Sequence, residues 1–81
     1  MFTIVEGAGA SSKREFARFL DMSIRSTMEV ESELELSHDY GVLDSRNWRS
    51  LSAEDVEIRK MLCGLRARIL RDLESDGQTS G

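Results

Sequence analysis

The hydrophobic positions of the chain recur at helical spacing along two long stretches. The first stripe steps by alternating fours and threes through Phe16, Leu20, Ser23, Thr27, Val30, Leu34 and Ser37. The second runs through Trp48, Leu51, Asp55, Ile58, Leu62, Leu65 and Ile69, with one acidic break. Residues three and four apart share one side of a helix, so each stripe is the apolar face of an amphipathic helix. The pattern predicts an all-α chain of two long helices.

Local signals place the ends of the first helix. Ser12 followed by Glu15 matches a capping box, in which the side chains at the first turn satisfy free backbone N–H groups. Gly41 suits the left-handed position that ends a helix, and Val42 is placed to fold back on the last turn. We therefore predict the first helix at about residues 12–40, preceded by a stub over residues 1–10.

The start of the second helix has two candidate signals. Asp44 can cap the helix, with Leu43 and Trp48 as the two halves of a hydrophobic staple. Ser52 with Asp55 imitates a capping box further along. We favour the earlier start and predict a helix from about residue 45 to 74. The last residues, 75–81, have nothing to bury, which predicts a disordered tail.

Two helices joined by so short a connection form an antiparallel hairpin, which has no closed core. A chain of 81 residues buries only about 60% of its unfolded surface, and its single cysteine excludes an intramolecular disulfide. We expect self-association to complete a bundle of the four-helix type. The predicted oligomer core is Phe16, Leu20, Val30, Leu34, Trp48, Leu51, Ile58, Leu62, Leu65 and Ile69.

Composition narrows the class of protein further. The absence of proline favours uninterrupted helices, and no apolar run approaches the roughly 20 residues of a membrane span. We predict a cytoplasmic protein with no membrane partner. The net charge of −4 disfavours indiscriminate nucleic-acid binding unless the positive charges are segregated.

The charges are in fact segregated along the predicted hairpin. Basic side chains gather where the helix termini meet, and acidic ones gather near the turn. One hypothesis is that the basic end contacts RNA phosphates. Its candidate residues are Lys13, Arg14, Arg18, Arg59, Lys60, Arg66 and Arg68. The favoured alternative is that opposite ends meet in an antiparallel dimer or are simply solvated, because no stacking aromatic side chains accompany the arginines.

Only one arrangement suggests metal chemistry. Glu35 and His38 form the Glu-x-x-His pair of di-iron bundles, and two copies with Glu31 would complete a ferritin-like site at a dimer interface. His38 lies in the last helical turn, where an imidazolium favours the helix dipole, so we expect no metal, no cofactor and no enzymatic activity. Cys63 is expected to be a small packed residue, and Gly64 to mark a close helix approach.

Three segments carry a family resemblance: "IVEGAGASSKREFARFL", "ELELSHDYGVL" and "IRKMLCGLRARIL". Over roughly residues 3–70 the chain resembles the four-helix-bundle proteins encoded by intervening sequences of 23S ribosomal RNA. The matching positions are Ile4, Glu6, Gly7, Gly9, Ser12, Glu15, Phe16, Phe19, Leu20, Glu29, Glu31, Leu34, Gly41, Met61, Leu62, Gly64 and Leu65. Thr3, Arg25 and Asp55 depart from the usual pattern.

The resemblance implies that "FTIVEG" is the end of the second family helix, so that this chain is a half-bundle. A natural truncation, a misplaced start codon and a deliberate shortening all fit. Family members are ring-like oligomers without established catalysis, and a distant relative in diversity-generating retroelements assists a reverse transcriptase and RNA. The resemblance therefore implies a scaffold or adaptor whose partners are itself, structured RNA or a reverse-transcriptase-like protein.

Overall fold

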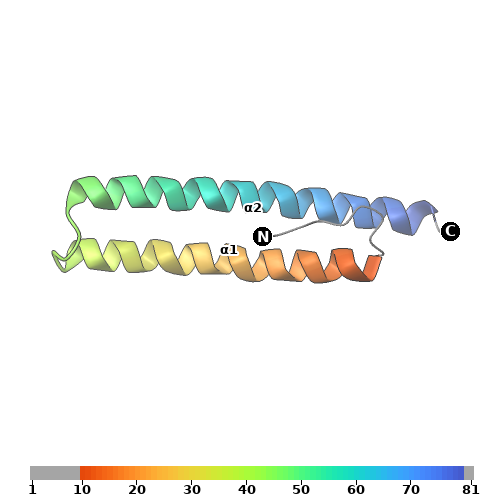
Figure 1. The fold of residues 1–81 in the computed structure, drawn as a ribbon, viewed down its shortest axis with the longest axis horizontal. Helices are drawn as coiled ribbons and strands as arrows, with labels where there is room; N and C mark the ends of the chain where they lie inside the picture. The colour runs from red at the N-terminus through yellow and green to blue at the C-terminus, as the bar shows by residue number, and fades with distance from the viewer. Residues whose placement is uncertain (1–9, 80–81) are drawn as a thin grey trace.

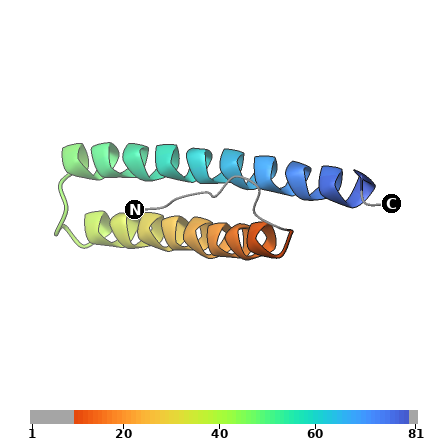
Figure 2. The same ribbon diagram turned by 45° about the vertical axis from the view of Figure 1, so that its right-hand side comes forward.

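The computed structural model describes residues 10–79, with side chains for residues 11–75. Two antiparallel helices, α1 (Ala10–Asp39) and α2 (Ser45–Thr79), lie side by side and are joined by one tight turn, as Figures 1 and 2 show. The described residues contain no strand. This confirms the predicted all-α two-helix hairpin. The predicted stub and the segment "FTIVEG" lie almost wholly within residues 1–9, outside the described part of the chain.

The turn uses the glycine that the sequence indicated. Gly41 has a φ of 78°, the left-handed conformation that a side chain disfavours. The Val42 N–H donates to the Ser37 carbonyl at 2.9 Å and the Gly41 N–H to the His38 carbonyl at 3.0 Å, which together form a Schellman motif. The Val42 side chain is 84% exposed, so only its backbone folds back on the helix. The expected apolar contact is therefore slight.

The start of α2 confirms Asp44 as its N-cap. The Asp44 carboxylate accepts a hydrogen bond from the Asn47 backbone N–H at 2.7 Å, and its carbonyl accepts the first helical bond, from the Trp48 N–H, at 2.8 Å. Leu43 and Trp48, the staple pair, are both partly buried. The competing candidate, Ser52, lies inside α2.

The end of α2 corrects one expectation. The helix continues to Thr79 and not only to about residue 74, so residues 75–79 of the predicted tail are helical. Residues 80–81 lie outside the described part of the chain. The prediction relied on the absence of apolar residues to bury. Each residue added to an existing helix forms one further backbone hydrogen bond and needs no new nucleus. This segment also lacks the proline that would end the helix.

The hydrophobic core of the hairpin is small and lies in one half of its length. Ala17, Leu20 and Ile69 are the buried apolar residues among those described, and Leu20 is only 1% exposed. The partly buried side chains that pack around them are Phe16, Leu62, Leu65 and Leu73. All of these lie towards the helix termini. We call this part the open half (residues 10–26 and 60–79) and the remainder, residues 27–59, the turn half.

Candidate functional site

The centre of the hairpin is held by a polar network around Arg59. Its guanidinium donates to the Asp55 carboxylate at 2.8 Å and to the Glu31 carboxylate at 3.0 Å. It also donates to the Thr27 hydroxyl at 3.0 Å, and that hydroxyl in turn donates to the Ile24 carbonyl at 2.7 Å. Asp55, the acidic break in the second stripe, is 7% exposed and thus buried beside its own partner.

This network fixes how the helices are aligned. Arg59 binds Thr27 across the hairpin, and Arg66 pairs with Asp21 one to two turns further towards the open end. Both contacts require the same lengthwise alignment of α1 against α2, so together they specify one register. Among the described residues, every buried side-chain nitrogen or oxygen has a hydrogen-bond partner. The Asp55 carboxylate that interrupts the apolar stripe therefore has its hydrogen-bond partner within the hairpin.

One side of the hairpin presents apolar side chains to solvent. Val30 on α1 is 45% exposed, while Leu51, Ile58 and Met61 on α2 are 41%, 50% and 72% exposed. At 100° per residue these positions fall on the same side of the seam between the helices. Partly buried Leu34 and Leu65 lie along the same side. We call Val30, Leu34, Leu51, Ile58, Met61 and Leu65 the apolar face.

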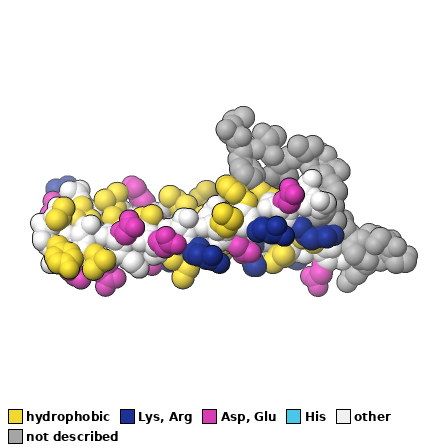
Figure 3. Space-filling model, turned by 90° about the horizontal axis from the view of Figure 1, so that it is seen from below, with side chains coloured by type: hydrophobic (Ala, Val, Ile, Leu, Met, Phe, Trp, Pro, Cys, Tyr) yellow, Lys and Arg dark blue, Asp and Glu magenta, His cyan; other side chains and the backbone are white. Residues whose placement is uncertain are grey.

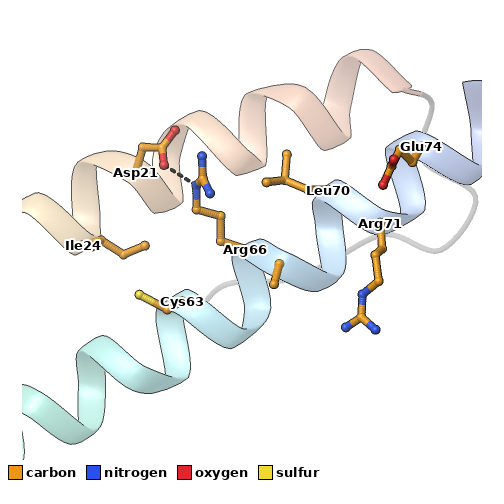
Figure 4. Close-up of a pocket in the computed structure, with 8 residues that line it drawn as sticks. Asp21, Ile24, Cys63, Arg66, Leu70, Arg71 and Glu74 are labelled. Atoms are coloured by element: carbon orange, nitrogen blue, oxygen red, sulfur yellow. Dashed lines mark hydrogen bonds and ion pairs between the residues drawn. The ribbon is translucent and has the colours of Figure 1, made fainter.

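The opposite side carries a groove in the open half, shown in Figure 4. Its volume is about 510 Å³, and it is lined by Asp21, Ile24, Cys63, Arg66, Ala67, Leu70, Arg71 and Glu74. The Asp21–Arg66 pair bridges the two helices across it, while Arg71 extends away from α1. The groove combines apolar walls with charges that are already neutralised in part.

Two expectations for the middle of α2 are wrong. Cys63 is exposed beside the groove and is not a packed residue. A Cβ added at Gly64 would meet nothing within 4 Å, so this glycine marks no close helix approach within the hairpin. The reason is rotational position: both residues lie away from the seam, which is formed at this level by Leu62, Leu65 and Arg66.

The residues predicted as an oligomer core fall into three groups. Leu20 and Ile69 are buried within the hairpin itself. A second group is partly buried: Phe16, Leu34, Trp48, Leu62 and Leu65. Val30, Leu51 and Ile58 are exposed. The hairpin thus uses part of the predicted core internally and leaves the rest on the apolar face.

Two of the three residues considered for a metal, His38 and Glu31, have other partners. The His38 ring stacks on Trp48, with ring centroids 4.3 Å apart, and its Nε2 is hydrogen-bonded to the Ser45 hydroxyl at 2.9 Å. Glu31 binds Arg59, and Glu35 is exposed. No group of three or more His, Cys, Asp or Glu among the described residues could hold a metal ion. His38 therefore closes the turn end of the hairpin.

The structure does not bring the seven candidate RNA-binding residues onto one surface. Arg59 points into the seam, and Arg66 is paired with Asp21. Lys60 is 70% exposed and lies 3.8 Å from Glu57, whereas Lys13 is partly buried. Arg14, Arg18 and Arg68 are exposed as well. Figure 3 shows the Lys and Arg side chains of the visible face mainly towards the open end.

Sequence reasoning missed the internal role of Arg59. A usable signal existed, because Asp55 and Arg59 are four residues apart on α2 and can pair along one side of a helix. Asp55 was correctly placed in the apolar stripe. An acidic residue there requires a partner, and the nearest cation along the helix supplies it.

No helix within the described residues combines the length and hydrophobicity that a bilayer crossing requires.

Comparison with known proteins identifies the family. A search of curated proteins gives no match, and neither does a search of solved structures. The sequence model of the 23S rRNA-intervening sequence proteins matches residues 1–64, which include α1, the turn, the Arg59 network and most of the apolar face. The chain belongs to the 23S rRNA-intervening sequence protein family.

Proposed function

We propose that two copies of this hairpin pack through their apolar faces, complete a four-helix bundle, and act together as a non-enzymatic scaffold. The supporting observation is that Val30, Leu51 and Ile58 are about half exposed and all lie in the turn half. None of the described apolar residues of that half is buried. The family is not a known enzyme family, which agrees with a binding role.

The side of the hairpin that carries the apolar face has the area of a stable dimer interface. A helix of 30 residues is about 45 Å long, and two adjacent helices are about 20 Å wide, so the whole side offers about 900 Å² per copy. The apolar face occupies the middle of this side, over about 21 Å from Leu51 to Leu65. A standard interface buries about 800 Å² on each partner, so an interface of that size includes the polar positions at both ends of the apolar face.

The energetic case rests on residues that gain most from being covered. Burying the exposed half of an aliphatic side chain contributes about 1 kcal/mol, so Val30, Leu51, Ile58 and Met61 together favour association by several kcal/mol. Part of this is lost to the entropy of association.

A pair of matched variants tests the proposal. Ile58→Asp places a carboxylate on the apolar face, whereas Leu36→Asp makes the same kind of change at a 54%-exposed position on the outer side of α1. We expect Ile58→Asp to raise the dissociation constant by at least a hundredfold in sedimentation equilibrium, and Leu36→Asp to change it little. Equal effects of the two variants, or a monomeric parent protein, would contradict the proposal.

RNA association is a second candidate, supported by the exposed cations on α1. Arg14, Arg18 and Arg25 are all exposed, and their spacing of four and seven residues forms one basic stripe along the outer side of the helix. The proposed partner is structured RNA held by phosphate contacts. A reverse-transcriptase-like partner and a cytoplasmic location stay predictions from the sequence.

The RNA candidate has a control of equal charge change. Arg14→Glu with Arg18→Glu is compared with Arg46→Glu and Arg49→Glu, two exposed arginines at the turn end. With a fluorescent RNA stem-loop, we expect only the first pair to weaken binding, by more than tenfold in anisotropy titrations at 50 mM salt. Equal weakening by both pairs would show attraction by net charge alone.

A further inference from the structure

The charges of the hairpin are divided sharply between its two halves. In the turn half the acidic residues are Glu29, Glu31, Glu33, Glu35, Asp39, Asp44, Glu54, Asp55 and Glu57, and the basic ones are Arg46, Arg49 and Arg59. In the open half the basic residues are Lys13, Arg14, Arg18, Arg25, Lys60, Arg66, Arg68 and Arg71, and the acidic ones are Glu15, Asp21, Asp72, Glu74 and Asp76. The turn half is therefore strongly negative and the open half is positive.

From this division we propose that the second copy binds the apolar face in the antiparallel orientation, with its turn half over the open half of the first copy. The proposal rests on the self-association proposed above and adds its direction. The apolar face lies across the middle of the hairpin, from Leu34 and Leu51 to Leu65, so hydrophobic contact alone permits either direction. The charges beside it distinguish the two.

The rim of the apolar face carries charges that respond to orientation. Glu33 lies one turn beyond Val30, and Glu54 lies between Leu51 and Ile58 at spacings of three and four. Glu57 precedes Met61 by four residues, while Arg68 follows Leu65 by three. All four side chains are exposed beside the apolar face, and the Glu57 carboxylate lies 3.8 Å from the Lys60 ammonium on the same helix.

Antiparallel docking matches these charges, and parallel docking opposes them. With the hairpins overlapped along their full length, antiparallel docking brings Arg68 of one copy to the level of Glu54 and Glu57 of the other. Parallel docking brings the two acidic turn halves together. Each exposed pair is weak, but several like-charge contacts together disfavour a wrong orientation.

Spin-label distances distinguish the two orientations. Val42 is 84% exposed in the turn, so Val42→Cys in a Cys63→Ser background accepts a label at the end of the hairpin. Antiparallel docking separates two such labels by about the helix length of 45 Å, whereas parallel docking brings them within about 20 Å. We expect a distribution centred beyond 40 Å at low salt. A distribution centred near 20 Å would overturn the proposed orientation.

A second label position separates failure of the orientation from failure of self-association. Ser26 is exposed near the middle of α1, so Ser26→Cys in the same background gives an intermolecular distance below about 30 Å in either orientation. Absence of any intermolecular signal from this variant would refute self-association itself. Its presence with short Val42→Cys distances would refute only the orientation.

A charge variant tests the cause of the orientation. Glu33→Gln, Glu54→Gln and Glu57→Gln together remove the repulsion between parallel turn halves while keeping side-chain size. In the Val42→Cys background, we expect a new population near 20 Å in addition to the long distance. A distribution identical to that of the unneutralised protein would overturn the assignment of orientation to these charges.

Discussion

The open half and the turn half of the hairpin are held together by different kinds of contact. In the open half, Leu20 is 1% and Ile69 4% exposed, and other aliphatic side chains pack around them. Towards the turn, the contacts across the seam include hydrogen bonds from Arg59 and the stacking of His38 on Trp48. One half is a small apolar core, and the other is a polar and aromatic seam.

This difference separates stability from alignment. Apolar contacts between Leu20 and its neighbours favour any close packing, because the hydrophobic effect is not directional. Hydrogen bonds from Arg59 to Thr27 and Glu31 require one register, since a shift by one turn would leave buried polar groups without partners. We infer that the open half supplies most of the stability, and that the Arg59 network of the turn half supplies most of the register, with the Asp21–Arg66 pair of the open half as a second, more exposed contribution.

The largest effect is expected from a cavity in the open half. Leu20→Ala removes the most buried side chain and should lower the free energy of unfolding by about 2–5 kcal/mol. Urea denaturation at a fixed chain concentration measures it, because association couples stability to concentration. Leu36→Ala, at a 54%-exposed position, is the matched control and should stay within about 0.5 kcal/mol. Similar small losses in both variants would mean that the open half is not the stabilising core.

An intermediate effect is expected from the seam of the turn half. Arg59→Met leaves the buried Asp55 carboxylate without its cation and should cost about 2–3 kcal/mol, less than a fully buried pair because Arg59 and Glu31 are partly solvated. Adding Asp55→Leu removes the unpaired charge, so the double variant should recover most of that loss in the same urea assay.

The double variant also sharpens the division between stability and register. We expect its amide NMR spectrum to show broadened or doubled resonances around Thr27, because the buried hydrogen bonds that select one register there are gone and only the exposed Asp21–Arg66 pair is left. A double variant as unstable as Arg59→Met alone would contradict the account of the pair. Sharp single resonances would assign the register to the apolar contacts instead.

The smallest effect is expected on the outer side of α2. Gly64 is exposed, and an added Cβ would meet no atom within 4 Å, so Gly64→Ala should stabilise the helix by up to about 1 kcal/mol. The change should leave the self-association constant unaltered, because this position lies away from the apolar face. Weaker association in sedimentation equilibrium would show that the partner covers the outer side of α2.

Much of the hairpin follows from local signals in the sequence. Gly41 and Asp44 end and start the helices through backbone geometry that involves only neighbouring residues, and both were predictable. The sequence did not predict which residues of the apolar stripe pack inside the hairpin and which lie on its surface. Val30 and Leu20 belong to the same stripe, yet one is 45% and the other 1% exposed, because they lie about 80° apart around α1 and the rotation of the helix about its axis depends on the whole seam.

The candidate site was less predictable than the fold. Arg59 and Arg66 were grouped with surface cations because sequence spacing does not show which long side chains reach across a seam. The end of α2 was missed for a related reason: the hydrophobic pattern stops before the backbone hydrogen bonding does. Both differences concern residues whose structure depends on contacts, or on helix propagation, and not on periodicity.

The central claim is that this hairpin completes its core only by association. The most direct test is the solution mass of the unmodified protein by light scattering across a dilution series, with circular dichroism on the same samples. The account predicts about twice the chain mass of 9.2 kDa at high concentration, with helicity that falls as dilution dissociates the dimer. A monomer that stays fully helical at every concentration would contradict it.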